Sequence, residues 1–204
     1  MMSFNARKLF CIPVFLIFLN FYSGAQEIST NTSSAIMRNW QNMNNNLAVT
    51  LSSDSRGFNS SIIDALREVP RHMFLDASYE KIAYENISLP AYGGSPKPSP
   101  SDILASIDIL SPASTDVVLI AGSNAGYAAA ILSKLAAEVY LIEESPAAAA
   151  YVEIFQELGI DNITVAEQPD INSFNDIFAF DKIFIHGAVS EISENITERL
   201  SIQG

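Results

Sequence analysis

The stretch VVLIAGSNAGYAAAIL, residues 117–132, constrains the fold of this chain more than any other. Four apolar residues run into a turn of small residues, and an alanine-rich segment follows. A buried parallel strand, a tight loop and a helix produce this pattern. Gly122 and Gly126 flank Asn124, where a nucleotide-binding loop more often has a further glycine. Asparagine tolerates a positive φ better than most residues, so we expect the turn to form.

The same alternation continues to the end of the chain. The pattern predicts strands at 116–122, 138–144, 162–168 and 181–188, and helices at 124–137, 145–159 and 190–200. Pro146 suits the first turn of the second of these helices, and Gly159 suits its end. Short apolar strands alternating with helices indicate a parallel sheet covered on both faces. Right-handed crossovers then give an α/β, Rossmann-like doubly wound domain.

The chain before residue 116 is less regular. We expect a short helix at 60–69, ended by Pro70, and a second at 101–110, capped by Ser99 or Ser101. Between them LPAYGGSPKPSPSD carries four prolines and two glycines, so it is either a linker or an ordered loop over a site. The predicted organisation is a polar segment with a weak helix at 26–58 and one domain at 59–204. Within that domain, 59–115 holds the N-terminal helices and the loop, and 116–204 holds the Rossmann-like core.

The N-terminus predicts a secretory signal peptide over residues 1–25. Two basic residues precede an apolar run at 9–21, and the small residues Ser23 and Ala25 lie where a signal peptidase cuts, before Gln26. We therefore expect a periplasmic or secreted protein with no stable membrane association after cleavage; an uncleaved anchor is the alternative. The only cysteine, Cys11, lies in this segment, so the mature protein is expected to have no disulfide and no cysteine metal site.

Charge and histidine content narrow the possible partners. The net charge is −12, and phosphate binding needs a basic surface, so we expect no nucleic-acid partner. The two histidines, His72 and His186, are far apart and lack metal-binding spacing, so we expect no metal site. His186 ends the last strand, where it could act as an acid, a base or a carboxylate partner, or simply pack. His72 and Tyr127 are expected to pack.

A ligand of such a fold binds at the carboxyl ends of the strands, near the switch in strand order. The loop residues Gly122, Ser123, Asn124 and Gly126 follow the first strand, where glycines let the backbone approach a ligand. Glu143 ends the second strand, about twenty positions past the first glycine, and an acidic residue there suits two ribose hydroxyls. These features alone fit any doubly wound domain as well as a cofactor site.

Further motifs resemble the protein-L-isoaspartate O-methyltransferase family. VPRHMFL (69–75) and AYENISLPAYGG (83–94) carry the most specific likeness, and GYAAAIL, VYLIE, LGIDNITV and FDKIF follow in the same order, over roughly residues 36–200. The resemblance implies a class I methyltransferase fold, S-adenosylmethionine as methyl donor, and isoaspartyl carboxylates of damaged proteins or peptides as substrate, without a metal. It implies cofactor contacts at the loop residues above, at Glu143 and at Asp170.

The chain departs from the family pattern at several of these places. The family loop reads roughly E-I-G-T-G-S-G-Y, and here Ile120 stands for the acidic residue and Asn124 for the middle glycine. The family's active-site serine falls on Pro98, so Ser99 is the candidate replacement if the loop shifts. Asp170 lies one position after the family's adenine-binding aspartate. These departures leave a second hypothesis open, a catalytically degenerate, exported methyltransferase-fold domain that binds proteins or peptides.

The family also continues beyond SIQG with further strands. We therefore expect a sheet that lacks the last strands, whose strand at 181–188 would be an unpaired apolar edge. Either the chain is a fragment of a longer protein, or something else covers that edge.

Overall fold

The computed structural model describes residues 39–90, 96–143, 147–166, 170–174, 176–177, 179–187 and 191–201. Asn39 and Trp40 belong to an N-terminal unit, Met1–Trp40, and the remainder forms a second unit, Gln41–Gly204, to which the following description applies. The predicted signal peptide lies outside the described residues. Among the residues described, no helix combines the length and apolar character needed to cross a membrane.

Four parallel strands form the sheet, as predicted. They are β1 (Val117–Ala121), β2 (Glu138–Ile142), β3 (Ile163–Val165) and β4 (Lys182–Ile185), in the spatial order β3-β2-β1-β4. The order reverses between β1 and β4, because the chain moves outward through β2 and β3 and then returns to the other side of β1. This reversal is the topological switch point of a Rossmann-like sheet, which confirms the expected fold class.

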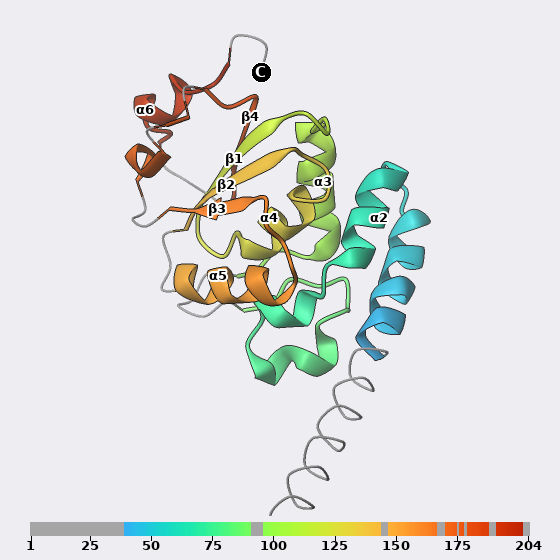
Figure 1. Cartoon of the computed structure of the whole chain (residues 1–204). Coiled ribbons are helices and arrows are strands. Elements are labelled where there is room, and N and C mark those ends of the chain that lie inside the picture. The colour runs from blue at the N-terminus through green and yellow to red at the C-terminus, as the bar shows by residue number, and fades with distance from the viewer. Residues whose placement is uncertain are drawn as a thin grey trace, which may run out of the picture. The chain divides into compact units, whose positions relative to one another are not determined.

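Helices cover both faces of the sheet (Figure 1). On one face lie α3 (Pro100–Leu110), α4 (Gly126–Leu132) and α5 (Ala148–Glu157). The other face carries the 3-10 helix η3 (Ile171–Phe174) and the single-turn helix α6 (Glu194–Thr197). The α4 face of the sheet buries the side chains of Val118, Ile120, Val139 and Leu141.

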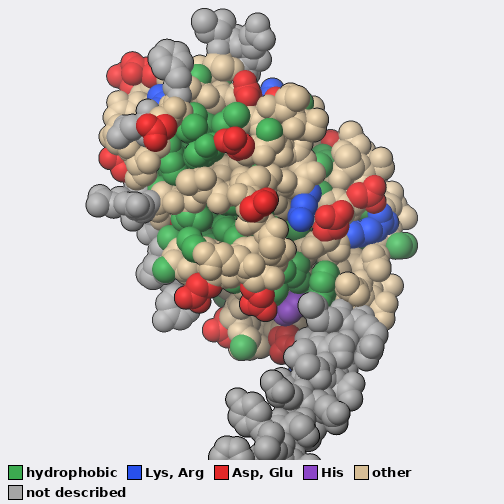
Figure 2. Space-filling view, viewed as in Figure 1, with side chains coloured by type: hydrophobic (Ala, Val, Ile, Leu, Met, Phe, Trp, Pro, Cys, Tyr) green, Lys and Arg blue, Asp and Glu red, His purple; other side chains and the backbone are tan. Residues whose placement is uncertain are grey.

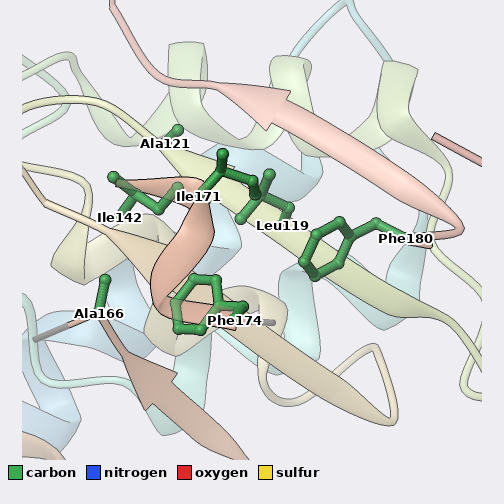
Figure 3. Packing of buried hydrophobic residues seen from close by; sticks show 7 residues of the cluster. All are labelled: Leu119, Ala121, Ile142, Ala166, Ile171, Phe174 and Phe180. Carbon is green, nitrogen blue, oxygen red and sulfur yellow. The ribbon is translucent and has the colours of Figure 1, made fainter. Parts of the chain in front are cut away.

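A hydrophobic cluster fills the space under η3. Leu119, Ala121 and Ile142 project from β1 and β2 into it, because strand side chains alternate between the two faces. Figure 3 shows Phe174 and Phe180 packed beside them, together with Ala166 and Ile171. Both faces of the sheet are therefore apolar, as its continuous hydrophobic strands predict.

The N-terminal half is helical. Residues 41–52 form a helix that is followed by α2 (Ser60–Glu68) and the 3-10 helices η1 (Arg71–Phe74) and η2 (Ala77–Ile82). The Asn44 side chain donates to the carbonyls of Leu66 (2.7 Å) and Val69 (3.2 Å), where α2 ends. These bonds give donor partners to carbonyls at the end of the helix, where the regular pattern of backbone hydrogen bonds stops.

Several predicted helix ends are confirmed and others are wrong. Ser99 caps α3, with its hydroxyl accepting from the Asp102 N–H, and Gly159 follows α5 with φ 63°. The helix expected at 124–137 ends at residue 132, because the Asn162 side chain donates to the carbonyls of Ser133 and Ala137 and fixes a turn into β2. The helix expected at 190–200 is only the one turn of α6.

Among the described residues, the outer edge of β4 is paired only just before the strand begins. Phe180 forms a parallel bridge with Leu200, and within the described chain no backbone group pairs with the outer edge of Lys182–Ile185. The predicted apolar edge is therefore present over these four residues.

Figure 2 shows acidic side chains scattered singly over one face of the molecule, with hydrophobic side chains between them.

Candidate functional site

The loop after β1 lies at the switch point of the sheet. Asn124 has φ 62°, as its sequence position predicted, and Gly122 has φ 135°. A Cβ atom on Gly122 would lie 2.0 Å from the carbonyl oxygen of His186, just past β4, whose N–H donates to Ala121 at 2.8 Å. The glycine is therefore required by the close approach of two strand ends.

Glu143 ties the end of β2 to this loop. Glu143 is only 4% exposed. Its two carboxylate oxygens accept from the backbone N–H groups of Asn124 and Ala125, each at 3.0 Å. A loop that binds pyrophosphate offers such N–H groups to the phosphate. Here a buried carboxylate already accepts them, so a phosphate would meet a negative charge. A carboxylate at this place suits a ligand that brings hydroxyl donors rather than phosphates.

Aromatic rings form an apolar wall beside the loop. A Cβ on Gly126 would lie 2.7 Å from the ring of Tyr151, so this glycine lets the ring pack against the start of α4. The Phe74 ring lies 5.7 Å from that of Tyr127 and 6.0 Å from that of Tyr151. Tyr127 is buried, as expected, and burial raises the pKa of its hydroxyl. These rings form a packed aromatic cluster beside the loop.

The buried side chain of Arg71 anchors the proline-rich loop. It is 1% exposed, and its guanidinium donates to the carbonyl oxygens of Ala83, Glu85, Ile87 and Pro98 at 3.1–3.2 Å. Burial lowers its pKa, and none of the ion pairs within the described residues includes it. Its charge is satisfied by four carbonyl dipoles that join the segment 83–87 to the loop at Pro98. The sequence placed Arg71 in a family motif but gave no sign of these partners.

Lys97 is the basic residue that the proline-rich loop brings to the site. Its backbone pairs with Leu89, and its ammonium donates to the Phe74 carbonyl at 2.6 Å. Burial lowers the pKa of Lys97, and the carboxylate of Glu143 opposes that shift. Burial also lowers the pKa of His186, and the Lys97 charge lowers it further. Lys97 is therefore within electrostatic range of both Glu143 and His186, although the three come from distant segments.

Sequence reasoning missed Lys97. The available signal was that it is the only basic residue between Leu89 and Asp102. No group of three or more His, Cys, Asp and Glu residues that could hold a metal occurs in the described part of the chain.

Comparison with known proteins assigns the family. The family model described as protein-L-isoaspartate(D-aspartate) O-methyltransferase matches residues 42–204. The chain belongs to this family. A protein-L-isoaspartate O-methyltransferase from Roseiflexus castenholzii is 34% identical over 144 residues, which are 70% of this chain and 66% of that relative. A protein-L-isoaspartate O-methyltransferase from Methanoregula boonei is 33% identical over 144 residues, which are again 70% of this chain and 66% of that relative. The chain thus spans 66% of the length of these curated relatives.

Solved structures agree with the fold. A protein-L-isoaspartate O-methyltransferase superposes with a TM-score of 0.67 at 25% identity, covering 78% of this chain and 52% of that one. A Plasmodium falciparum protein, described as a candidate member of the family in complex with S-adenosyl-L-homocysteine, gives a TM-score of 0.58 at 17% identity and covers 79% of each chain. The four-stranded sheet is therefore the sheet of a class I methyltransferase.

Two candidate site residues of this methyltransferase-family chain are engaged in local structure. The Ser99 hydroxyl lies in the cap of α3, where it donates to the Asp102 carboxylate at 2.6 Å and lies 3.1 Å from the Ser101 hydroxyl. Pro98 keeps its carbonyl on Arg71. Asp170 is exposed and accepts from the backbone and the side-chain amide of Asn172 at the start of η3, which lowers its pKa.

The other candidate positions lie in or next to the loop after β1. Ser123 is half-buried there, and Ile120, at the family's acidic position, is fully buried in the sheet. The structure thus brings together Gly122, Asn124 and Glu143, and it adds His186 and Lys97. It does not bring Ser99 into hydrogen-bond contact with them among the described residues.

Proposed function

We propose that this chain binds S-adenosylmethionine and directs methyl transfer to isoaspartyl carboxylates of damaged proteins or peptides. The observation that carries the proposal is the buried Glu143 carboxylate, held by two loop N–H groups beside the switch point. It supports a ligand with a ribose and without a pyrophosphate. The family supports S-adenosylmethionine as that ligand, and the related Plasmodium falciparum structure contains S-adenosyl-L-homocysteine.

When bound, S-adenosylmethionine supplies a methyl group already activated on a sulfonium. The chain then has to bind, orient and exclude water. Glu143 would hold the ribose hydroxyls, and the backbone at Gly122 and Asn124 would line the rest of the cofactor. Arg71 would keep the loop at Pro98 in place over the crevice.

A titration with S-adenosylhomocysteine tests the cofactor site. We expect micromolar binding by calorimetry and a loss of at least tenfold in Glu143→Gln, because an amide cannot accept from both loop N–H groups. Glu138→Gln is the matched control, since Glu138 begins the same strand and, among the described residues, its carboxylate accepts from the exposed Tyr140 hydroxyl alone. Methylation of an isoaspartyl peptide, compared with its aspartyl counterpart, then tests the reaction.

A degenerate binding module is the second candidate function. The observation that favours it is that Pro98 offers no hydroxyl and that the Ser99 hydroxyl is committed to the cap of α3. A folded chain that binds no S-adenosylhomocysteine would support this candidate and refute the enzyme. Binding of S-adenosylhomocysteine without methylation of the isoaspartyl peptide would show that the chain binds the cofactor but does not catalyse the transfer.

We also propose export to the periplasm or the outside of the cell. The basic residues, the apolar run at 9–21 and the small residues before Gln26 support it. Mass spectrometry of the protein isolated from its own cells should give a mature N-terminus at Gln26. An intact N-terminus on a protein in the cytoplasm would refute the proposal.

A further inference from the structure

The Lys97 ammonium has donors left over in a half-buried site. It carries three N–H groups, and its one hydrogen bond to a described residue is to the Phe74 carbonyl. Neither Asp nor Glu forms an ion pair with it among the described residues. Two donors of a partly desolvated cation therefore point to an anionic partner that the described chain does not supply.

The position of Lys97 is set from three sides. Its backbone pairs with Leu89, and the next residue, Pro98, has its carbonyl held by Arg71. Its ammonium is fixed at the carbonyl of Phe74, whose ring packs against Tyr127 and Tyr151 beside the cofactor loop. The side chain is thus a positioned group and not a solvated surface lysine.

The charges around Lys97 leave its positive charge only partly balanced. Glu143 is the acidic neighbour whose charge acts on Lys97, but the two form no ion pair among the described residues, and both Glu143 oxygens accept from loop N–H groups. His186 is buried, and Lys97 and burial both lower its pKa, which favours the neutral ring. The positive charge of Arg71 also acts on Lys97 and lowers its pKa. The Lys97 ammonium itself therefore remains able to donate to an incoming anion.

We propose that the Lys97 ammonium binds a carboxylate at this crevice, in place of the hydroxyl or N–H that Pro98 cannot provide. The inference rests on the proposed function, which brings two carboxylates to the site. One is the acceptor carboxylate of the isoaspartyl substrate, and the other belongs to the methionyl part of the cofactor. An ammonium recognises both by the same charge-assisted hydrogen bond.

Lys97→Gln is the variant of choice. Its amide can still donate to the Phe74 carbonyl, but it has no charge, so it separates carboxylate binding from structural support. Lys97→Arg keeps the charge and should retain affinity within about fivefold. Lys134→Gln is the matched control, because Lys134 lies just past the end of α4 and pairs only with Glu68, at 3.7 Å, among the described residues. If Lys97→Gln does not fold, Lys97→Arg and Lys97→Met provide the same comparison.

Calorimetry on the full chain with three probes distinguishes the two carboxylates. The probes are S-adenosylhomocysteine, 5′-methylthioadenosine, which has the nucleoside but no carboxylate, and an isoaspartyl peptide added to the protein saturated with S-adenosylhomocysteine. Loss of one charge-assisted hydrogen bond should weaken the affected probe by about 10- to 100-fold. A weaker S-adenosylhomocysteine with unchanged 5′-methylthioadenosine assigns the carboxylate to the cofactor. Unchanged S-adenosylhomocysteine with a weaker peptide assigns it to the substrate.

Two results would overturn the inference. If the wild type binds its ligands and Lys97→Gln binds all three within twofold of it, Lys97 only supports the loop, and the proposed function stands. If the folded wild type binds neither S-adenosylhomocysteine nor the peptide, the proposed function and this inference both fail.

Discussion

Arg71→Met tests whether a buried cation holds the N-terminal segment and the proline-rich loop together. Methionine fills the same space along the side-chain stem but makes none of the four hydrogen bonds to carbonyl oxygens. The bond to Ala83 is buried, whereas the other three are partly buried, so water can replace the guanidinium only at those three.

The expected loss follows from this difference. A buried carbonyl left without a partner costs about 1–3 kcal/mol, and each carbonyl that water can reach costs about 0.5 kcal/mol. Removing the buried charge offsets part of this, because burial lowers the pKa of Arg71 and so disfavours its charged form. We expect the free energy of unfolding to fall by about 3 kcal/mol, a large fraction of the 5–15 kcal/mol typical of a domain.

Urea unfolding followed by far-ultraviolet circular dichroism measures this loss. Arg67→Met is the matched control, because Arg67 lies in the last turn of α2, only four residues earlier, and its exposed guanidinium pairs with Asp64. An exposed pair of this kind is worth at most about 1 kcal/mol. If Arg71→Met loses no more than Arg67→Met, the carbonyl cluster does not anchor the loop, and the argument for Arg71 is wrong.

Three further predictions follow from the switch point. Gly122→Ala should lose at least about 3 kcal/mol or fail to fold, because its Cβ would lie 2.0 Å from the His186 carbonyl; Gly57→Ala, with φ 68° and nothing within 4 Å, should lose only about 1 kcal/mol. Equal losses in thermal melts would show that the close approach is not what requires Gly122. Asn124→Ala should be about 1 kcal/mol less stable than Asn124→Gly, because only glycine adopts φ 62° without strain; a reversed order in urea unfolding would contradict this. Burial lowers the pKa of His186 from 6.5, so as the pH falls below that value the unfolded chain binds the proton first, and stability should decline by up to about 1.4 kcal/mol per pH unit. His186→Gln should flatten that part of the stability curve, and identical slopes in both proteins would exclude His186 as the cause.

Local patterns predicted the order of elements and several of their details. The strand, loop and helix at residues 117–132, the positive φ of Asn124 and the position of Gly159 after a helix all depend on a few neighbouring residues. Ser99 was one of two predicted caps for the same reason. Such features are readable because turn chemistry and hydrophobic periodicity act over short distances.

The extent of the elements was harder to predict. The helix that begins at Gly126 ends about one turn early, because Asn162 donates to the backbone carbonyls after it. This contact joins residues that are 25 to 29 positions apart. No window of local sequence contains both partners, so propensity alone extends the helix too far.

The sequence by itself thus determined the class of fold, the loop that faces the crevice and the acidic residue at the end of β2. Only the tertiary structure decided what these residues do there. It turned Glu143 toward the loop N–H groups, made Gly122 necessary through the carbonyl of His186, and used Ser99 in a helix cap. It also fixed the Lys97 ammonium at the Phe74 carbonyl, within electrostatic range of Glu143. The reason is that the crossovers and strand register of a parallel sheet place distant segments at one edge, and contacts made there have no counterpart in local sequence.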